Sequence, residues 1–431
     1  MNRDLGRILC VAVPKISGGA LQVFFNLLLI RHLSPEHFGM VSLCLTGIVM
    51  SDAVLGSALD MGILRLAPVY EQNGQRMRSV SLQKAALSIK PIGVALVTVP
   101  VMFLGSRLSQ AFFQRSGGES LILLTLIGLL GLLMLRSAQL YYQVANRFVP
   151  YGLTDILQNA LKFGGIMLLL AVATPTPERI LMFYAIAPLS VALLTIAGSR
   201  ELICAPLGRE SLYELADVVR WYVATAAIGS ISSRMDVFLV SIFSNVAEAG
   251  IFSAANAVAI VPQLCGTYMA VVYSPRIMPL WEQGRLFAVF KTFQRNLVLA
   301  CVGIYIIAAA GLSQFGTWLL PQNFARSSSV ILVLLPAALC GLVNFPWTVS
   351  LLLFMRPQFL LVFEAASFVL LVPLYGYVVP AWGAIGGAAV STGFALLKTF
   401  VYQSVAWRVL RSQPGTVPEQ STFLVPKELR T

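Results

Sequence analysis

The sequence predicts an all-α integral membrane protein with twelve transmembrane helices, arranged as two parallel-repeat six-helix lobes around a central cavity. Three observations predict this fold class. First, 58% of the 431 residues are hydrophobic and only 11% are charged, a balance far outside the usual range for a soluble domain. Second, apolar windows long enough to cross a bilayer recur along the chain. Third, the chain contains an internal repeat, as described below.

The apolar windows have roughly the 20 residues needed to cross the hydrocarbon core. We expect the membrane spans at residues 8–30, 38–62, 85–106, 120–143, 151–173, 180–198, 218–243, 250–273, 297–319, 329–354, 359–380 and 385–407. The first window is too long for the apolar region of a signal peptide and lacks a small-residue cleavage site, so we expect it to be retained as the first membrane helix.

The internal repeat joins the two halves of the chain. The octapeptide Arg65-Leu-Ala-Pro-Val-Tyr-Glu-Gln72 returns 211 residues later as Arg276-Ile-Met-Pro-Leu-Trp-Glu-Gln283. The same offset pairs Gly18 with Gly229, Gly39 with Gly250 and Ser42 with Ser253. Because six predicted spans separate the copies, both copies have one orientation and the repeat is parallel. Such a repeat is typical of transporters built from two related halves, and it directs the search for function to their interface.

These patterns predict the domain organisation. Residues 1–198 form an N-terminal six-helix lobe, 199–217 a cytoplasmic linker, 218–411 a C-terminal six-helix lobe and 412–431 a disordered cytoplasmic tail. One set of predicted loops contains five arginines, namely Arg31, Arg107, Arg115, Arg179 and Arg326, whereas the other set and the termini contain nineteen Lys and Arg residues. This asymmetry predicts that both termini are cytoplasmic. It also accounts for most of the net charge of +12 without nucleic acid.

Ten charged residues remain inside the predicted spans. The cations are the candidate substrate-binding residues: Lys15, Lys90, Arg136, Lys162, Arg234 and Lys398. The acids are candidates for ion coupling or for charge balance: Asp52, Asp155, Asp236 and Glu364. Charge at this depth requires water or a partner, so the set predicts a hydrated cavity. Lys15 and Lys90 lie near the cytoplasmic ends of their spans, where they could instead snorkel to the interface. The excess of cations favours an anionic cargo such as a phosphate group.

The fifth span shows this pattern most clearly. Asp155, Gln158, Asn159 and Lys162 follow helical spacing and form one polar stripe on an otherwise apolar helix. The fourth span repeats the pattern with Arg136, Gln139 and Gln143, and the seventh places Ser230 near Arg234. Asp236 lies about 200° around the helix from Arg234, so we expect each to find a partner elsewhere.

Three segments resemble a known family. They are Leu33-Ser-Pro-Glu-His-Phe-Gly39 with Asp60-Met-Gly62 and Arg65, then Arg234-Met-Asp236 with Gly250-Ile-Phe-Ser-Ala-Ala255, and Trp382-Gly-Ala-Ile-Gly-Gly-Ala-Ala389. Their order and the twelve predicted spans resemble the bacterial polysaccharide (O-antigen or exopolysaccharide) flippases of the multidrug/oligosaccharidyl-lipid/polysaccharide exporter superfamily, abbreviated MOP, whose fold is also described as MATE-like. The resemblance covers nearly the whole chain.

The resemblance implies a V-shaped pair of lobes that alternates between inward- and outward-open states. The cargo would be an undecaprenyl-pyrophosphate-linked oligosaccharide in the bacterial inner (plasma) membrane. Further partners would be membrane lipids, a polysaccharide polymerase and chain-length machinery; we expect a monomer and no cofactor or metal. The first-half counterpart of Asp236 is Phe25, so this acid is not duplicated.

The repeated octapeptides contain the candidate cytoplasmic gate. It comprises Arg65, Pro68 and Glu71 in the first copy and Arg276, Pro279 and Glu282 in the second. These segments could meet across the lobes and close the inward-open state. Alternatively, each proline ends its helix and each arginine anchors at the lipid headgroups.

Two other functions remain open. A drug or metabolite antiporter of the same superfamily would share the span count and the repeat, although a cationic cargo favours an acidic cavity with aromatic cages. A membrane polysaccharide polymerase or ligase would also use lipid-linked sugars, but such enzymes typically have a large outside loop, which is not predicted here. No P-loop, HExxH or GxSxG motif occurs, and the two histidines, His32 and His37, share one predicted loop. The sequence therefore favours a transporter over an enzyme.

Overall fold

The computed structural model describes residues 18–115, 117–266, 269, 283, 286–354 and 357–412. These residues form two compact units. The first unit contains the described residues up to Ala254, together with Leu320–Phe324 and Tyr375–Gly387. The second contains the described residues of Ala255–Leu319, of Ala325–Leu374 and from Ala388 onward. The lobe boundaries at residues 198 and 218 remain a prediction.

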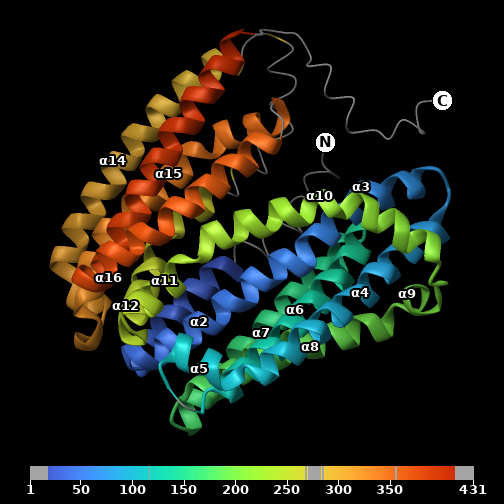
Figure 1. Ribbon diagram of the computed structural model, residues 1–431, viewed down its shortest axis with the longest axis horizontal. Helices are drawn as coiled ribbons and strands as arrows, with labels where there is room; N and C mark the ends of the chain where they lie inside the picture. The colour runs from blue at the N-terminus through green and yellow to red at the C-terminus, as the bar shows by residue number, and fades with distance from the viewer. Residues whose placement is uncertain are drawn as a thin grey trace. The chain divides into compact units, whose positions relative to one another are not determined.

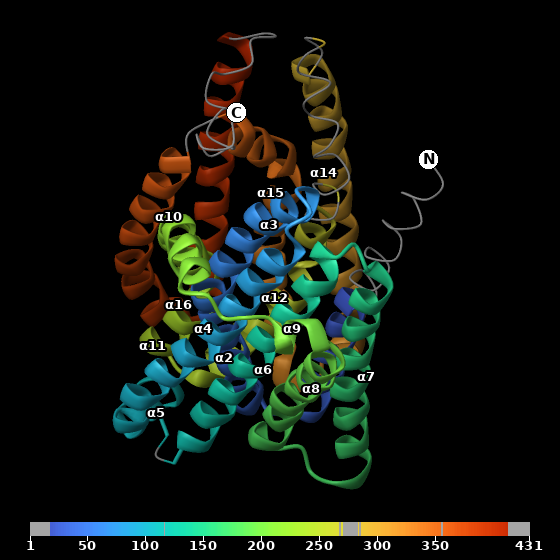
Figure 2. The same ribbon diagram turned by 90° about the vertical axis from the view of Figure 1, so that its right-hand side faces the viewer.

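The first unit is a bundle of helices. After helical residues 18–32, it contains α2 (Pro35–Asp52), the π-helical turn η1 (Ala53–Ser57), α3 (Ala58–Gln72), α4 (Arg76–Phe103), α5 (Gly105–Phe113), α6 (Glu119–Val144), α7 (Phe148–Val172), α8 (Pro177–Gly198), α9 (Arg200–Cys204), α10 (Arg209–Arg234), α11 (Asp236–Phe243) and the first part of α12 (Val246–Ala259). Helix α6 packs against α8, α4 and α2, and α7 packs against α8 (Figure 2). Helix α10 lies along α3 and also contacts η1 and α4 (Figure 1).

Local sequence sets several of these helix boundaries. Ser34 and Thr176 cap α2 and α8 by accepting hydrogen bonds from the backbone N–H groups three residues later, and a proline follows each cap at the first helical position. Both features are favoured at helix starts. Pro68 lies inside α3, which continues to Gln72. The alternative in which this proline ends its helix is therefore wrong.

The second unit consists mainly of α14 (Leu286–Leu319), α15 (Ala325–Phe354) and most of α16 (Pro357–Ser412); the short 3₁₀ turn η2 (Gln322–Phe324) belongs to the first unit. Helix α16 is broken at Gly383, where φ is +57°. A Cβ atom here would lie 2.5 Å from Oε2 of Glu248, which accepts a hydrogen bond from the N–H of Ala384 at 2.8 Å. Only glycine suits this position, and the two arms of α16 correspond to the last two predicted spans.

Eight helical segments of the described chain are long and apolar enough to cross a membrane. They are Pro35–Gln72, Arg76–Phe103, Glu119–Val144, Phe148–Val172, Pro177–Gly198, Ala288–Gln314, Gln322–Thr348 and Val362–Arg408. The last is 47 residues long and includes the break at Gly383. Lys15, the start of the first predicted span and the tail from residue 413 lie outside the described residues. The all-α membrane class is thus confirmed, whereas the count of twelve spans is not.

The segment between α8 and α10 is held against other helices of the first unit by hydrogen bonds. Glu201 in α9 accepts hydrogen bonds from Arg76 at 2.6 Å and from Tyr141 at 3.0 Å. These two bonds hold the pKa of Glu201 below its usual value. The Lys84 amino group donates to the carbonyl oxygens of Ile203 and Ala205, both at 2.6 Å. The predicted linker therefore carries a folded segment anchored on α4 and α6.

Helices α2 and α12 cross at two glycines of the repeat, Gly39 and Gly250. A Cβ atom on Gly39 would overlap the carbonyl oxygen of Val246, and one on Gly250 would overlap the carbonyl oxygen of Pro35. Each of these Cβ atoms would also lie 3.0 Å from the backbone nitrogen of the other glycine. Pro35 and Val246 are themselves 211 residues apart. The contact is therefore reciprocal, as two-fold-related repeats require, and the absence of side chains lets the backbones touch.

This crossing predicts a stability difference between glycine variants. Gly39→Ala and Gly250→Ala should each destabilise the protein by about 1–3 kcal/mol, because the added methyl group meets backbone rather than a flexible side chain. Gly164→Ala in α7 is the matched control, since nothing lies within 4 Å of its Cβ position, and alanine favours helix. Thermal unfolding of the purified protein in detergent measures all three. Equal melting temperatures for Gly39→Ala and Gly164→Ala would contradict the tight crossing.

Candidate functional site

Helix α7 turns its polar stripe inward and its apolar side chains outward. Asp155, Gln158 and Asn159 are half-buried, and Lys162 is buried with 7% of its surface exposed. Their apolar neighbours Leu153, Ile156, Leu157 and Leu161 are exposed. This is the reverse of a soluble amphipathic helix and fits a helix with lipid on its apolar side. The described helix thus places the four polar residues together, as the spacing predicts.

The Lys162 ammonium group has an unusual set of neighbours. It donates a hydrogen bond to Oε1 of Gln22 at 3.3 Å. It also lies 4.3 Å from the centre of the Phe163 ring and 5.1 Å from that of Tyr184. Among the described residues, no carboxylate oxygen lies within 4 Å of this ammonium group. Its charge is stabilised by an amide oxygen and by ring faces, which attract a cation without neutralising it, and at longer range by the Asp155 carboxylate.

Gln22 joins Lys162 to two further side chains. Its amide nitrogen donates to Oδ1 of Asn26 at 3.1 Å and to the Tyr184 hydroxyl at 3.0 Å. Phe25 stacks on Phe163, with ring centres 4.0 Å apart and planes inclined by 8°. The first-half counterpart of Asp236 is therefore an aromatic packing residue. Sequence reasoning missed Gln22, Asn26 and Tyr184, although the spacing of Gln22 and Asn26 by four residues in an apolar helix was a usable signal.

Arg136 and Asp155 both have partners within the first unit. The Arg136 guanidinium pairs with Oδ2 of Asp52 at 2.6 Å. Asp155 accepts a hydrogen bond from the Gln139 amide at 2.7 Å. The Arg136 side chain is 42% exposed whereas that of Asp52 is 2% exposed. The Arg136 side chain is therefore partly accessible at the surface of the bundle, whereas the Asp52 carboxylate is not.

The Lys90–Asp60 pair differs from the Arg136–Asp52 pair because here the cation is the buried partner. Its side chain is fully buried, and its amino group lies 2.6 Å from Oδ1 of Asp60 and 2.7 Å from the Ser137 hydroxyl. The expectation that Lys90 could snorkel to the membrane interface is wrong, because this pair and Ser137 hold the ammonium group inside the bundle. Asp60 was not among the charged residues predicted inside the spans. In the structure, its ion pair with Lys90 links α3 to α4.

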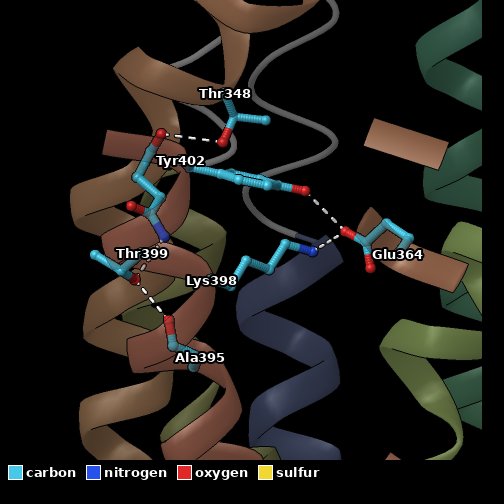
Figure 3. A network of polar contacts seen from close by, with 7 residues as sticks. Thr348, Glu364, Ala395, Lys398, Thr399 and Tyr402 are labelled. Atoms are coloured by element: carbon cyan, nitrogen blue, oxygen red, sulfur yellow. Dashed lines mark hydrogen bonds and ion pairs between the residues drawn. The ribbon is translucent and has the colours of Figure 1, made fainter. Parts of the chain in front are cut away.

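The second unit contains a polar cluster on α16, shown in Figure 3. Lys398 and the Tyr402 hydroxyl both reach the same carboxylate oxygen of Glu364, the hydroxyl at 2.9 Å. The Lys398 side chain is 37% exposed and that of Glu364 is 16% exposed. On the neighbouring helix α15, the Asn344 amide donates to the Thr399 hydroxyl at 2.7 Å. Glu364 thus balances the charge of Lys398 in this structure.

The remaining predicted residues are distributed as follows. Arg234 is exposed at the end of α10, and Asp236 begins α11 after a turn at Met235. An acid in the first turn of a helix is favoured by the helix dipole. Arg65, Pro68 and Glu71 lie on α3 and are half-buried. The second copy of the predicted gate, Arg276, Pro279 and Glu282, lies outside the described residues, so closure by the two copies remains a prediction.

Comparison with models of protein families gives no match, and neither does comparison with curated proteins. Solved structures do match. The chain is similar to the lipid II flippase MurJ in an inward-closed conformation, with 11% identity, 92% of this chain and 87% of that chain covered, and a TM-score of 0.71. It is similar to an inward-facing multidrug resistance MATE family transporter of the MOP superfamily, with 13% identity, 94% and 99% coverage and a TM-score of 0.72.

A further match is a MOP superfamily transporter from Pyrococcus furiosus whose binding pocket is described as having reverse polarity, with 11% identity, 94% and 96% coverage and a TM-score of 0.58. At these identities the likeness shows the fold. The chain is therefore a multi-pass membrane protein with the all-α fold of the MOP superfamily transporters.

The buried Lys90–Asp60 pair gives a stability prediction. Asp60→Asn should destabilise the protein by about 3–5 kcal/mol, because it leaves the ammonium group buried without a counter-charge. Ser137→Ala removes only one hydrogen bond to the same group and should cost about 1 kcal/mol. Thermal unfolding in detergent compares the two variants. A smaller loss for Asp60→Asn than for Ser137→Ala would show that the pair does not stabilise the bundle.

Proposed function

We propose that this protein is a flippase that moves an undecaprenyl-pyrophosphate-linked oligosaccharide across the bacterial inner membrane by alternating access. The cargo would be a repeat unit for O-antigen or exopolysaccharide synthesis. The observation that carries the proposal is the Lys162 ammonium group, which is buried in α7 and has no carboxylate within 4 Å among the described residues. The MurJ-like fold supports it.

The chemistry around Lys162 favours an anionic group. A buried cation with no carboxylate in contact is costly unless a partner arrives. The hydrogen bond to Gln22 and the two aromatic rings stabilise the ammonium group only in part. A phosphate oxygen forms charge-assisted hydrogen bonds with lysine and can supply a negative charge in direct contact. Lys162 is accordingly proposed as the primary contact for the pyrophosphate.

The distribution of exposed cations favours a large headgroup over a compact ion. Arg136 on α6 has 42% of its side chain exposed, and Arg234 on α10 is also exposed. A small anion needs one or two such groups, whereas a pyrophosphate linked to several sugars can contact different cations as it moves. The exposed apolar side chains of α7 would face the lipid chain and the bilayer.

A drug or metabolite antiporter fits the fold equally well, since the multidrug transporter match has a similar TM-score. The site favours it less. A cationic cargo needs accessible carboxylates, but Asp52, Asp60 and Glu364 are each paired with a cation, and the half-buried Asp155 accepts a hydrogen bond from Gln139. A polymerase or ligase remains the third alternative. Cytoplasmic termini, a monomeric state and a polymerase with chain-length machinery as partners belong to the flippase proposal.

The test is surface polysaccharide production in a strain that lacks this gene. Wild type should restore polymer, Lys162→Ala should restore less than about a tenth of it, and Lys162→Arg should restore a larger part because it keeps the charge. Lys291→Ala is the matched control, since Lys291 is an exposed cation of α14. Membrane abundance is measured for every variant.

The deletion strain should also accumulate lipid-linked repeat units on the cytoplasmic side. Unchanged polymer in that strain, together with increased sensitivity to toxic cations, would replace the flippase with the antiporter. Full-length lipid-linked polymer without ligation would instead indicate a ligase.

A further inference from the structure

The ion pairs Lys90–Asp60 and Arg136–Asp52 lie inside the described membrane helices, and they differ in which partner is accessible. In Lys90–Asp60 the cation has no exposed side-chain surface. In Arg136–Asp52 the guanidinium is 42% exposed and the carboxylate 2%. An anion can therefore approach Arg136 without displacing the protein around Asp52. A guanidinium exposed at this position in a membrane bundle needs water or an anionic partner.

The two carboxylate oxygens of Asp52 differ in their interactions. Oδ2 is paired with Arg136 at 2.6 Å. Oδ1 is buried and accepts no hydrogen bond from any described residue. Such an oxygen is costly to bury, because a carboxylate can accept several hydrogen bonds. The unused oxygen therefore needs an explanation beyond the ion pair.

The backbone around Asp52 makes room for this oxygen. Asp52 is the last residue of α2, and the π-helical turn η1 follows it directly. A Cβ atom on Gly56 in this turn would lie 2.9 Å from Oδ1 of Asp52 and 2.5 Å from Leu133. Glycine thus leaves space beside Oδ1 that any other residue would fill. Single π-helical turns within α-helices often occur at functional sites.

The charged groups that face Asp52 come from three helices. They are Arg136 on α6, Asp60 on α3 and Lys90 on α4. Asp60 and Lys90 neutralise each other, so Arg136 is the cation that balances Asp52. Helix α10 also packs against η1, but its sequence has no charged residue between Arg220 and Arg234. If Arg136 moved away, the Asp52 carboxylate would lose the cation that pairs with it, and Lys90 is held by Asp60.

We propose that Asp52 is a proton-binding site controlled by the cargo: a pyrophosphate group draws Arg136 away, and the carboxylate left behind takes up a proton. This inference rests on the proposed function. One ion pair breaks, between Arg136 and Asp52, and another forms, between Arg136 and a phosphate oxygen. One proton from solvent bonds to a carboxylate oxygen of Asp52, and no other covalent bond changes.

The direction of the pH dependence follows from this exchange. An unpaired carboxylate buried beside Leu133 and Gly56 is strongly disfavoured, and protonation removes its charge. The cargo-bound protein therefore holds a proton at Asp52 more tightly than the empty protein does. By linkage, pyrophosphate binds more tightly as pH falls, and Asp52 is responsible for that part of the pH dependence.

The experiment measures pyrophosphate binding to the purified full-length protein by titration calorimetry at several pH values. Asp52→Asn cannot hold Arg136 by charge, so it should tighten binding by about three- to tenfold, as expected for losing a half-exposed competing ion pair. Arg136→Ala should weaken binding, and adding Asp52→Asn to it should have no further effect. If Asp52 had only a structural role, the Asp52→Asn substitution would not raise the affinity for pyrophosphate.

A second measurement keeps the test independent of how well the variants fold. Titrations in buffers of different ionisation enthalpy give the number of protons taken up on binding. Wild type should take up as much as one proton more per pyrophosphate than Asp52→Asn or Arg136→Ala, a difference in which the titration of the ligand itself cancels. Equal proton uptake in wild type and Arg136→Ala would overturn the exchange.

Inorganic pyrophosphate and undecaprenyl pyrophosphate are used in parallel. If both bind with the predicted differences, the exchange recognises the pyrophosphate group itself; if only the lipid form does, the lipid chain is part of the site. Binding of both without any effect of Asp52→Asn would overturn the proton site and leave the flippase standing. Binding of neither to wild type would overturn the flippase proposal together with the exchange.

Discussion

The free-energy cost of burying charge in a low-dielectric interior is the constraint on which most of this structure depends. Lys90 and Asp60 satisfy it by pairing inside the bundle, and in doing so they join α3 to α4. Arg136 and Lys398 avoid much of this cost because each pairs with an acid and keeps part of its side chain exposed. Lys162 satisfies it only in part, through Gln22 and two aromatic rings. The proposed cargo site is where this balance is least complete.

Much of the fold could be predicted because it depends on local pattern. Apolar windows gave the membrane class, and the repeat offset of 211 residues gave the pairing of Gly39 with Gly250, whose backbones meet in the structure. The division of α16 into two arms was predicted as the gap between two spans, but the need for glycine at Gly383 was not, because it arises from a through-space contact with Glu248. The anchoring of α9 by Arg76 and Lys84 likewise joins residues more than 100 positions apart.

The candidate site was predicted less completely for the same reason. Helical spacing found the α7 stripe and its Lys162, but it could not assign ion-pair partners across helices. Asp60, Ser137 and Tyr184 were therefore identified as interaction partners only in the structure. The net excess of cations also overstated the available positive charge, since Lys90, Arg136 and Lys398 are each paired with a carboxylate. What distinguishes these pairs is the exposure of the cation, which a residue count does not contain.

Transport in vesicles tests the anionic-cargo account most directly. The purified protein would be reconstituted with a fluorescent undecaprenyl-pyrophosphate-linked glycan, and its transfer between leaflets would be followed by quenching from outside. The account predicts transfer that the wild-type protein accelerates and that the same lipid without its phosphates does not show. A protein that leaves both lipids in place while exchanging a cationic dye such as ethidium for protons would contradict it.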